Sequence, residues 1–216
     1  FDEVTSDVTL VVQGERMPAH RALLASRSSF FRAMFFGPMK ESCQEAVEVN
    51  TFAPSTMRLI LRFIYSGSVE DVLLEDMVPL MACADHYGVS ALKDAIGTHL
   101  CDSISAETAC TVLALARTYK QEHVTEEYLS FILMHAQQVV KTEGFLNLDV
   151  AVLMKVLESD NTRIEEIDLF KALARWYRHW AKEPAPRDHG SQAERLFGSI
   201  RYAQMTGEQL VTEVRP

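Results

Sequence analysis

Apolar and polar residues alternate over short segments in the first fifty positions, which is the pattern of β-strands. Residues 7–12 (DVTLVV) alternate and are rich in β-branched side chains, so they predict a strand. Residues 13–16 (QGER) carry a turn signal, and residues 17–20 can pair back as a second strand. Residues 46–50 (AVEVN) predict a short third strand.

A helical period replaces this alternation from residue 21 onward. Residues 21–36 contain no glycine or proline and place apolar side chains at helical spacing. The pair Ser28-Ser29 is expected to divide them into two helices, because serine favours helix caps over helix interiors. Residues 54–65 begin with a proline, precede Gly67 and are apolar on most sides, so they predict a central helix.

After residue 74 the sequence shows no convincing strand. Residues 74–88 and 89–104 predict two helices separated at Gly88, and residues 105–140 predict a helix pair. An amphipathic stripe within that pair is expected to be core rather than a binding groove, and it consists of Leu129, Ile132, Leu133, Ala136 and Val140.

Capping signals divide the last third of the chain. Thr162 and Glu165 have capping-box spacing before a predicted helix, and Thr206 and Gln209 repeat that spacing. Residues 182–192 are polar and rich in proline and glycine, which predicts a loop. The apolar side of the helix before this loop comprises Ile167, Phe170, Leu173, Ala174, Tyr177 and Trp180.

These elements predict two domains: a small sheet with surrounding helices, followed by an all-α region. A mixed region followed by a helical one is typical of separate modules. We place an α+β domain over residues 1–103 and a helical domain over residues 104–216. Because Phe1 is not a natural start, we expect the chain to be part of a longer protein.

Charge and composition exclude several classes of function. The net charge of -9 argues against nucleic-acid binding, which needs clustered Lys and Arg. No apolar window is long enough for a membrane helix, so no membrane contact is expected. The four cysteines lack CxxC spacing, and three of them lie in apolar helical patterns. We therefore expect reduced thiols and a cytoplasmic location, with the nucleus as the alternative.

Catalytic and metal-binding signatures are absent from the sequence. It contains no GxGxxG, GxxxxGK[ST], GxSxG or HExxH motif. Cys83 and His86 could share a helix face, but they have no second pair with zinc spacing. Cys43, beside Lys40, has no identifiable base and is interpreted as an exposed thiol. We expect neither an enzyme nor a bound cofactor or metal.

The stretch FFGPMKES, residues 35–42, places a large apolar side chain beside charged ones. Gly37 and Pro38 interrupt the preceding helix, so Met39 to Ser42 are expected to form a loop. Methionine adapts to a groove on a partner, and the neighbouring Glu41 can accept charge-assisted hydrogen bonds. The alternative is that Met39 folds back over the phenylalanines and Glu41 is an ordinary solvated charge.

The first hundred residues contain, in this order, the segments PAHR-x-x-L-A, FRAMF, MKES and FIYSG. In the order and spacing of these segments, nearly all of residues 4–102 resemble a BTB (POZ) domain of the kind that precedes a BACK domain. The segments KTEGFLNLD (141–149), EEIDLFKALARWYRHW (165–180) and IRYAQMTGEQLVTEV (200–214) are similar to successive helices of a BACK domain.

The resemblance implies a substrate adaptor for a cullin-3 ubiquitin ligase. In that family a hydrophobic-x-Glu motif on the loop after the third helix of the BTB domain contacts the cullin, and Met39-Lys40-Glu41 matches that motif. The expected cullin-binding residues are Phe36, Met39, Lys40, Glu41, Asp85 and His86.

The resemblance also implies a homodimer formed through an N-terminal helix, the first helices after the hairpin and a charged Asp-Arg pair. The chain begins only a few residues before the first predicted strand, so we expect that most of this N-terminal helix is missing or never existed. A plain salt bridge within one domain remains the alternative for the pair. The expected dimer-interface residues are Asp7, Arg21, Leu24, Phe30 and Phe31. The BACK domain is expected to act as a spacer toward a substrate-recognition domain that is absent from these residues. The alternative function is an oligomerisation scaffold, cytoskeletal or transcriptional, without a ligase role.

Overall fold

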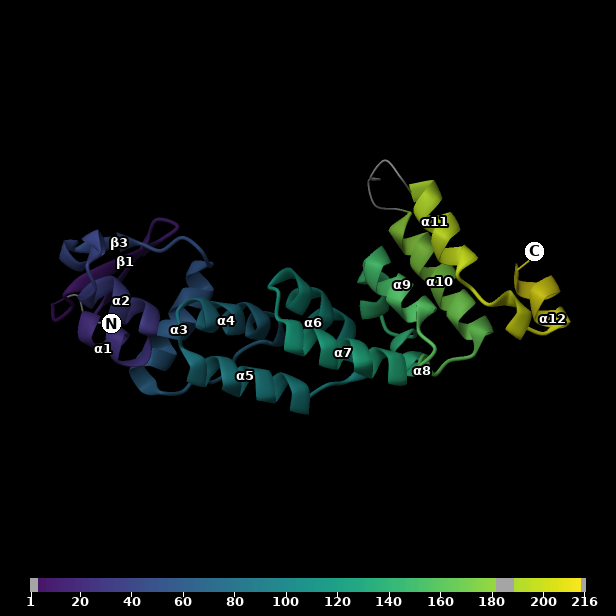
Figure 1. Ribbon diagram of the computed structural model, residues 1–216, viewed down its shortest axis with the longest axis horizontal. Helices are drawn as coiled ribbons and strands as arrows, with labels where there is room; N and C mark the ends of the chain where they lie inside the picture. Colours follow the sequence, from purple (N-terminus) through teal and green to yellow (C-terminus); the bar gives the residue numbers. More distant parts are fainter. Residues whose placement is uncertain (1–3, 182–188, 215–216) are drawn as a thin grey trace. The chain divides into compact units, whose positions relative to one another are not determined.

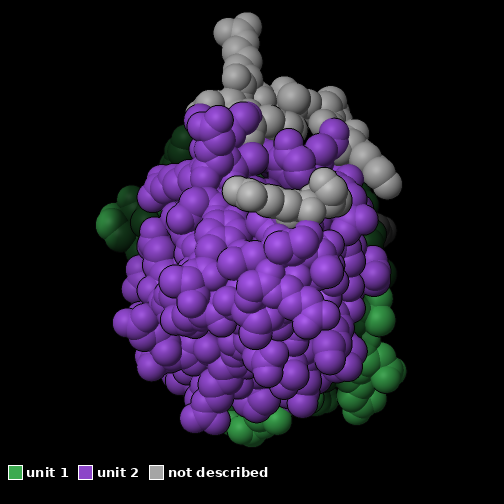
Figure 2. Space-filling model, turned by 90° about the vertical axis from the view of Figure 1, so that its right-hand side faces the viewer, with its two compact units in different colours: residues 1–102, 119–121 green, residues 103–118, 122–216 purple. Residues whose placement is uncertain are grey.

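The chain folds into two compact units, coloured green and purple in Figure 2, and Figure 1 labels their helices and strands. The computed structural model describes residues 4–181 and 189–214. The first unit contains the residues up to Asp102 together with Tyr119–Gln121, and the second contains Ser103–Thr118 and the residues from Glu122 onward. A small sheet with helices in the first unit and helices alone among the described residues of the second confirm the predicted fold class.

The sheet of the first unit has three strands in the order β2-β1-β3. The central strand pairs with β2 antiparallel and with β3 in parallel, and its inward side chains Leu10 and Val12 are buried. Gln13 and Gly14 both have positive φ, so the hairpin turn takes two residues and the second strand begins two residues earlier than predicted. The strands are β1 (Val8–Val12), β2 (Glu15–Ala19) and β3 (Ala46–Glu48).

The helices of the first unit follow the predicted divisions. Ser28 separates the first two helices, because its Oγ accepts a hydrogen bond from Phe31 N–H at 3.0 Å and donates one to the Tyr87 carbonyl. Gly88, at φ +63°, separates the last two, and an added Cβ there would lie 2.1 Å from Ser29 Oγ. The helices are α1 (Arg21–Arg27), α2 (Ser29–Phe36), η1 (Lys40–Cys43), α3 (Pro54–Ser66), α4 (Leu74–His86) and α5 (Ser90–Asp102).

The core of the first unit joins α2 to the end of α4. The Phe31 ring stacks on the Tyr87 ring, with centroids 5.1 Å apart and planes 6° apart. Helix α3 buries Met57, Ile60 and Leu61, as expected for a central helix. These contacts fix the position of α2, whose end leads into the FFGPMKES stretch.

The second unit is helical, and its helices α6 (Ala106–Thr118) and α10 (Glu166–Trp180) both pack against the short 3₁₀ helix η2 (Gly144–Asn147). Trp176 of α10 is fully buried, and its Nε1–H donates to the Leu148 carbonyl at 2.9 Å. The rings of Phe170 and Tyr177 contact Phe197 of α11 edge-on. The elements are α6 (Ala106–Thr118), α7 (Glu122–Met134), α8 (Ala136–Val139), η2 (Gly144–Asn147), α9 (Val150–Glu158), α10 (Glu166–Trp180), α11 (His189–Gly198), η3 (Tyr202–Gln204), α12 (Gly207–Gln209) and η4 (Leu210–Val214).

One sequence prediction for this unit was wrong in detail. The amphipathic stripe of residues 129–140 is not one helix, because the chain breaks at His135 between α7 and α8. Three of its five apolar residues, Ile132, Ala136 and Val140, are buried, and Leu129 and Leu133 are half-buried.

The predicted cap of α10 is also wrong. Thr162 Oγ1 donates to the Val156 carbonyl at the end of α9, and Glu165 occupies the N-cap without a side-chain bond. The second capping box is confirmed, because Thr206 and Gln209 each accept from the other's backbone N–H. Of the loop predicted over residues 182–192, residues 182–188 lie outside the described residues, and the rest belong to α11.

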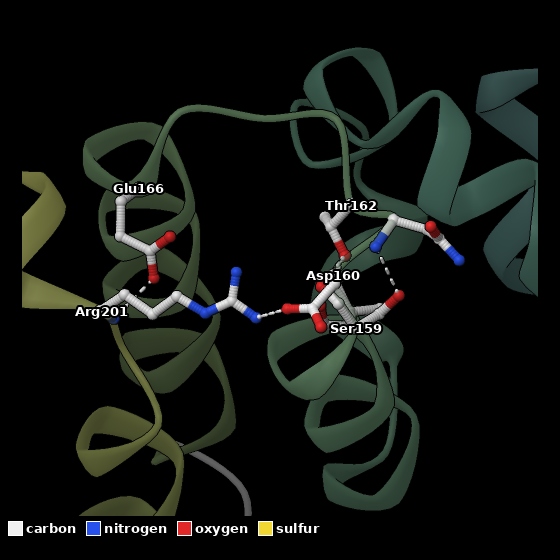
Figure 3. A network of polar contacts seen from close by, with 7 residues as sticks. Ser159, Asp160, Thr162, Glu166 and Arg201 are labelled. Carbon is white, nitrogen blue, oxygen red and sulfur yellow. Dashed lines mark hydrogen bonds and ion pairs between the residues drawn. The ribbon is translucent and has the colours of Figure 1, made fainter.

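Arg201, which lies between α11 and η3, bonds to residues at both ends of the connection between α9 and α10 (Figure 3). Its backbone N–H donates to Glu166 Oε1 at 2.7 Å, and its Nη2 donates to Asp160 Oδ1 at 2.8 Å. The two acceptors differ in environment, because Glu166 is half-buried and the Asp160 side chain is 93% exposed.

Candidate protein-interaction site

The candidate site begins where α2 ends. Gly37 closes the helix by donating its N–H to the Ala33 carbonyl, and an added Cβ would lie 2.2 Å from that oxygen. Pro38 cannot continue the helix. The expected irregular loop is instead ordered as the 3₁₀ helix η1 after Met39, and Ser42 Oγ donates to the Met39 carbonyl at 2.6 Å.

The side chain of Arg21, at the start of α1, holds this turn by bonding to the backbone carbonyls of the turn. Its guanidinium donates to the Ser42 carbonyl at 2.6 Å, to the Gln44 carbonyl, and to the Glu41 carbonyl at 3.5 Å. Its Cζ also lies 5.0 Å from the centre of the Phe35 ring. A planar guanidinium suits this arrangement because it presents several donors in fixed directions. The turn is therefore clamped to α1.

The clamped turn presents apolar surface outward. Phe36 is 67% exposed and Met39 is 49% exposed. About half of the Met39 side chain is therefore open to a partner, and the other half is covered by its own chain. Glu41 is half-buried, and no described lysine, arginine or histidine forms an ion pair with its carboxylate. Two large apolar side chains exposed three positions apart in the sequence make this turn a candidate interaction site.

Asp85 and His86 lie exposed at the end of α4 and form a second part of the predicted site. The His86 ring lies 5.5 Å from the Phe30 ring and 5.6 Å from the Phe52 ring, so it packs beside α2. Asp85 accepts from Lys93 Nζ at 2.6 Å. None of the ring contacts or ion pairs within the described part of the chain joins these two residues to Met39 or Glu41.

The predicted dimer residues divide between surface and core. Asp7 Oδ1 accepts from the backbone N–H of Arg21 at 2.8 Å, while the Arg21 guanidinium turns toward the carbonyls of the clamped turn. Leu24 and Phe31 are 0% exposed in the single chain and Phe30 is half-buried. The first two therefore belong to the core rather than to a contact surface, because a fully buried side chain cannot reach a partner without rearrangement.

The buried titratable groups of the first unit are structural. Burial raises the pKa of the Cys83 thiol to about 12, and burial is also the main reason that the pKa of Tyr87 rises to about 12. In the second unit burial raises the pKa of the Cys110 thiol to about 12. These three groups stay protonated and uncharged at neutral pH.

Metal sites and membrane-spanning helices were considered for the described ranges, 4–181 and 189–214. There, no group of three or more His, Cys, Asp or Glu side chains is placed to hold a metal ion. None of the helices there has the length and apolar character needed to cross a membrane.

The role of Arg21 as a clamp was missed by reasoning from the sequence. Its acceptors are backbone carbonyls about twenty positions away, and a residue pattern does not show which carbonyls accept, because every residue has one. The nearest signal was Ser42, a residue type that favours turns.

Comparisons with known proteins agree with both units. A family model described as "BTB/POZ domain" matches residues 1–104, and a model described as "BTB And C-terminal Kelch" (BACK) matches residues 109–215. BTB/POZ domain-containing protein 9 of Rattus norvegicus is 32% identical over 99% of this chain and 34% of its own length. Kelch-like protein 26 of Homo sapiens is 30% identical over 97% of this chain and 33% of its own length.

The chain thus spans about a third of the length of these two relatives. Among solved structures, the BTB domain of zebrafish PATZ1 is 32% identical, with a TM-score of 0.40 over 45% of this chain and 77% of that chain.

Proposed function

The chain belongs to the BTB–BACK family of protein-interaction adaptors, and from this premise we propose that it serves a cullin-3 ubiquitin ligase as a substrate adaptor. In this proposal the first unit docks cullin-3 and pairs with a second copy of the chain. The second unit is the spacer toward a substrate-recognition domain outside these residues. The catalytic chemistry belongs to the ligase, and the working compartment is the cytoplasm or the nucleus.

The observation that carries the proposal is the ordered, outward-facing turn at Met39. Binding loses affinity when a loop must first be ordered, and a loop already held in place avoids that cost. The Arg21 bonds to the carbonyls of Ser42 and Gln44 supply the order before any partner arrives.

Burial of the exposed apolar side chains at this turn would contribute the free energy expected of an anchor residue in an interface. Full burial of a methionine or phenylalanine side chain contributes roughly 1.5–3 kcal/mol, and Phe36 and Met39 each have about half or more of their surface still to bury. Glu41, with no described ion-pair partner, can then accept charge-assisted hydrogen bonds from the cullin. Apolar anchors beside one charged group favour a protein partner with a matching groove.

A double variant tests the docking site directly. We expect Met39→Ala with Glu41→Ala to weaken binding to purified cullin-3 more than tenfold by titration calorimetry, because both anchor and charge are lost. The melting temperature should change little, since both side chains are at the surface. The matched control is Leu73→Ala with Glu70→Ala, which removes an exposed leucine and an exposed carboxylate elsewhere in the same unit. It should bind like the parent chain.

Unchanged affinity in a folded double variant would remove the assignment of this turn. If the parent chain forms dimers by light scattering yet captures no cullin-3 at all, the scaffold function replaces the adaptor function.

A further inference from the structure

Helix α10 carries a row of basic side chains on the second unit. Lys171, Arg175 and Arg178 follow one another at intervals of four and three residues, so they lie along one side of the helix. With Lys141 and His179 they line two hollows of about 350 and 390 Å³, which share Arg175 and Arg178. We call this surface the basic groove.

Part of the positive charge of the basic groove is not neutralised by a carboxylate of the described residues. Arg175 Nη2 donates to the Val140 carbonyl at 2.6 Å and to the Thr142 carbonyl at 3.1 Å, which occupies donors but adds no negative charge. Its Nε is buried and has no hydrogen-bond partner. No described carboxylate forms an ion pair with Lys141, Arg175 or Arg178. Asp168 also lines the first hollow and offsets one of these charges.

One end of the basic groove already holds a carboxylate from a distant segment. Glu213, near the end of the chain, lies with its Oε1 3.0 Å from Lys171 Nζ. The next two basic positions along the helix, Arg175 and Arg178, have no such partner among the described residues. The groove therefore accepts an acidic side chain at one point and offers further positions beyond it.

We propose that the basic groove binds an acidic segment of a partner protein. Lys171 and Arg178 are seven residues apart, which is a rise of about 10 Å along a helix. An extended peptide advances about 3.3 Å per residue, so carboxylates three positions apart match this separation when the first of them takes the place of Glu213 at Lys171. Because the net charge of -9 repels an acidic ligand at a distance, the attraction comes from the local positive charge of the groove, which acts at short range. This inference does not depend on cullin-3 docking.

The test uses the whole 216-residue chain and a fluorescein-labelled peptide in which two glutamates flank two alanines. Fluorescence anisotropy at low salt should show saturable binding that weakens as salt is added. Arg178→Glu should weaken the binding at least tenfold, whereas Arg178→Lys should keep most of it. The matched control is Lys155→Glu, the same kind of charge reversal at an exposed position on α9, and it should change the Kd less than twofold.

Three results would overturn the proposal, provided that circular dichroism shows folded variants. The first is equal binding of a peptide with glutamine in place of both glutamates. The second is complete displacement of the peptide by inorganic phosphate at the peptide's own concentration, which indicates a simple anion site. The third is tighter binding of a single-stranded oligonucleotide than of the peptide.

Discussion

Each unit uses one arginine to hold a turn through backbone carbonyls, but the two turns present different surfaces. In the first unit Arg21 donates to the carbonyls of Ser42 and Gln44. In the second unit Arg175 donates to the carbonyls of Val140 and Thr142, just beyond α8. Each arginine satisfies carbonyls that a helix or turn leaves without an intrahelical partner.

The difference lies in what surrounds each guanidinium. Arg21 lies over the Phe35 ring, and its turn exposes Phe36 and Met39, so the surface there is apolar. Arg175 lies beside Arg178 on α10, so the surface there is cationic. The same local contact can therefore order a site for an apolar anchor or a site for an acidic ligand. The neighbouring side chains decide which.

The largest expected effect comes from removing either arginine. Arg21→Ala and Arg175→Ala should each lower the free energy of unfolding by about 2–3 kcal/mol, because each leaves carbonyls without a charged donor. Only Arg21→Ala should also weaken cullin-3 binding, since only its turn carries Met39. Chemical denaturation and calorimetry on both variants measure the two effects.

Lysine variants sharpen the comparison. Arg21→Lys and Arg175→Lys keep the charge but replace the planar fork by a single ammonium group, so each should recover less than half of the lost stability. If Arg175→Ala weakened cullin-3 binding as much as Arg21→Ala does, the two turns would not be separate in function.

Helix caps give the next largest effect and differ in their response to pH. In the first unit, Ser28→Ala should cost about 1–2 kcal/mol at every pH, because it removes a buried, uncharged cap of α2. In the second unit Asp149 caps α9 by accepting from Val152 N–H. Burial alone would raise the pKa of Asp149, but hydrogen bonds from Arg117 and Val152 outweigh it, and the pKa lies below its usual value.

A lowered pKa in the folded state fixes the sign of the pH effect. The contribution of Asp149 is present above its ordinary pKa, near 3.8, and is lost as the pH falls through the lower folded value. We therefore expect the stability difference between the parent chain and Asp149→Asn to shrink below about pH 4. Thermal melts at several pH values test this, with Ser28→Ala as the uncharged control. A difference that stayed constant down to pH 3 would contradict the assignment.

Local chemistry in the sequence predicted most of the fold of the first unit. Each of the useful signals acts over a few residues and corresponds to an element or a boundary in the structure. They are the alternation around Leu10, the serine pair at Ser28 and the breaks at Gly67 and Gly88. In the second unit the cap predicted at Thr162 was wrong, because the Thr162 hydroxyl donates to a carbonyl of α9 instead of capping α10. The choice between two nearby partners depends on tertiary packing, which a local pattern does not record.

The candidate site was predicted only in part. The position of Met39 between Pro38 and Glu41 was enough to suggest an exposed apolar residue, because proline ends the helix there. The sequence did not indicate that Arg21 orders the turn. It also did not indicate that Phe31 is core rather than contact surface, since a helix face buried within one domain and one buried between two copies have the same apolar pattern.

The smallest expected effect is at the two carboxylates that bind Arg201 (Figure 3). Asp160→Ala should change the free energy of unfolding by less than about 0.5 kcal/mol, because the Asp160 side chain is 93% exposed and water replaces its ion pair. Glu166→Ala should cost about 1 kcal/mol, because it removes the acceptor of a half-buried backbone N–H.

Urea denaturation of both variants measures the two free-energy changes, and Glu166→Gln is the control that keeps an acceptor oxygen. The two variants compare, at one arginine, an exposed ion pair of the side chain with a hydrogen bond of the backbone N–H. If Asp160→Ala proved as costly as Glu166→Ala, the exposed ion pair would stabilise the second unit as much as the backbone hydrogen bond does. The backbone hydrogen bond of Arg201 would then not be the larger of its two contributions to the stability of that unit.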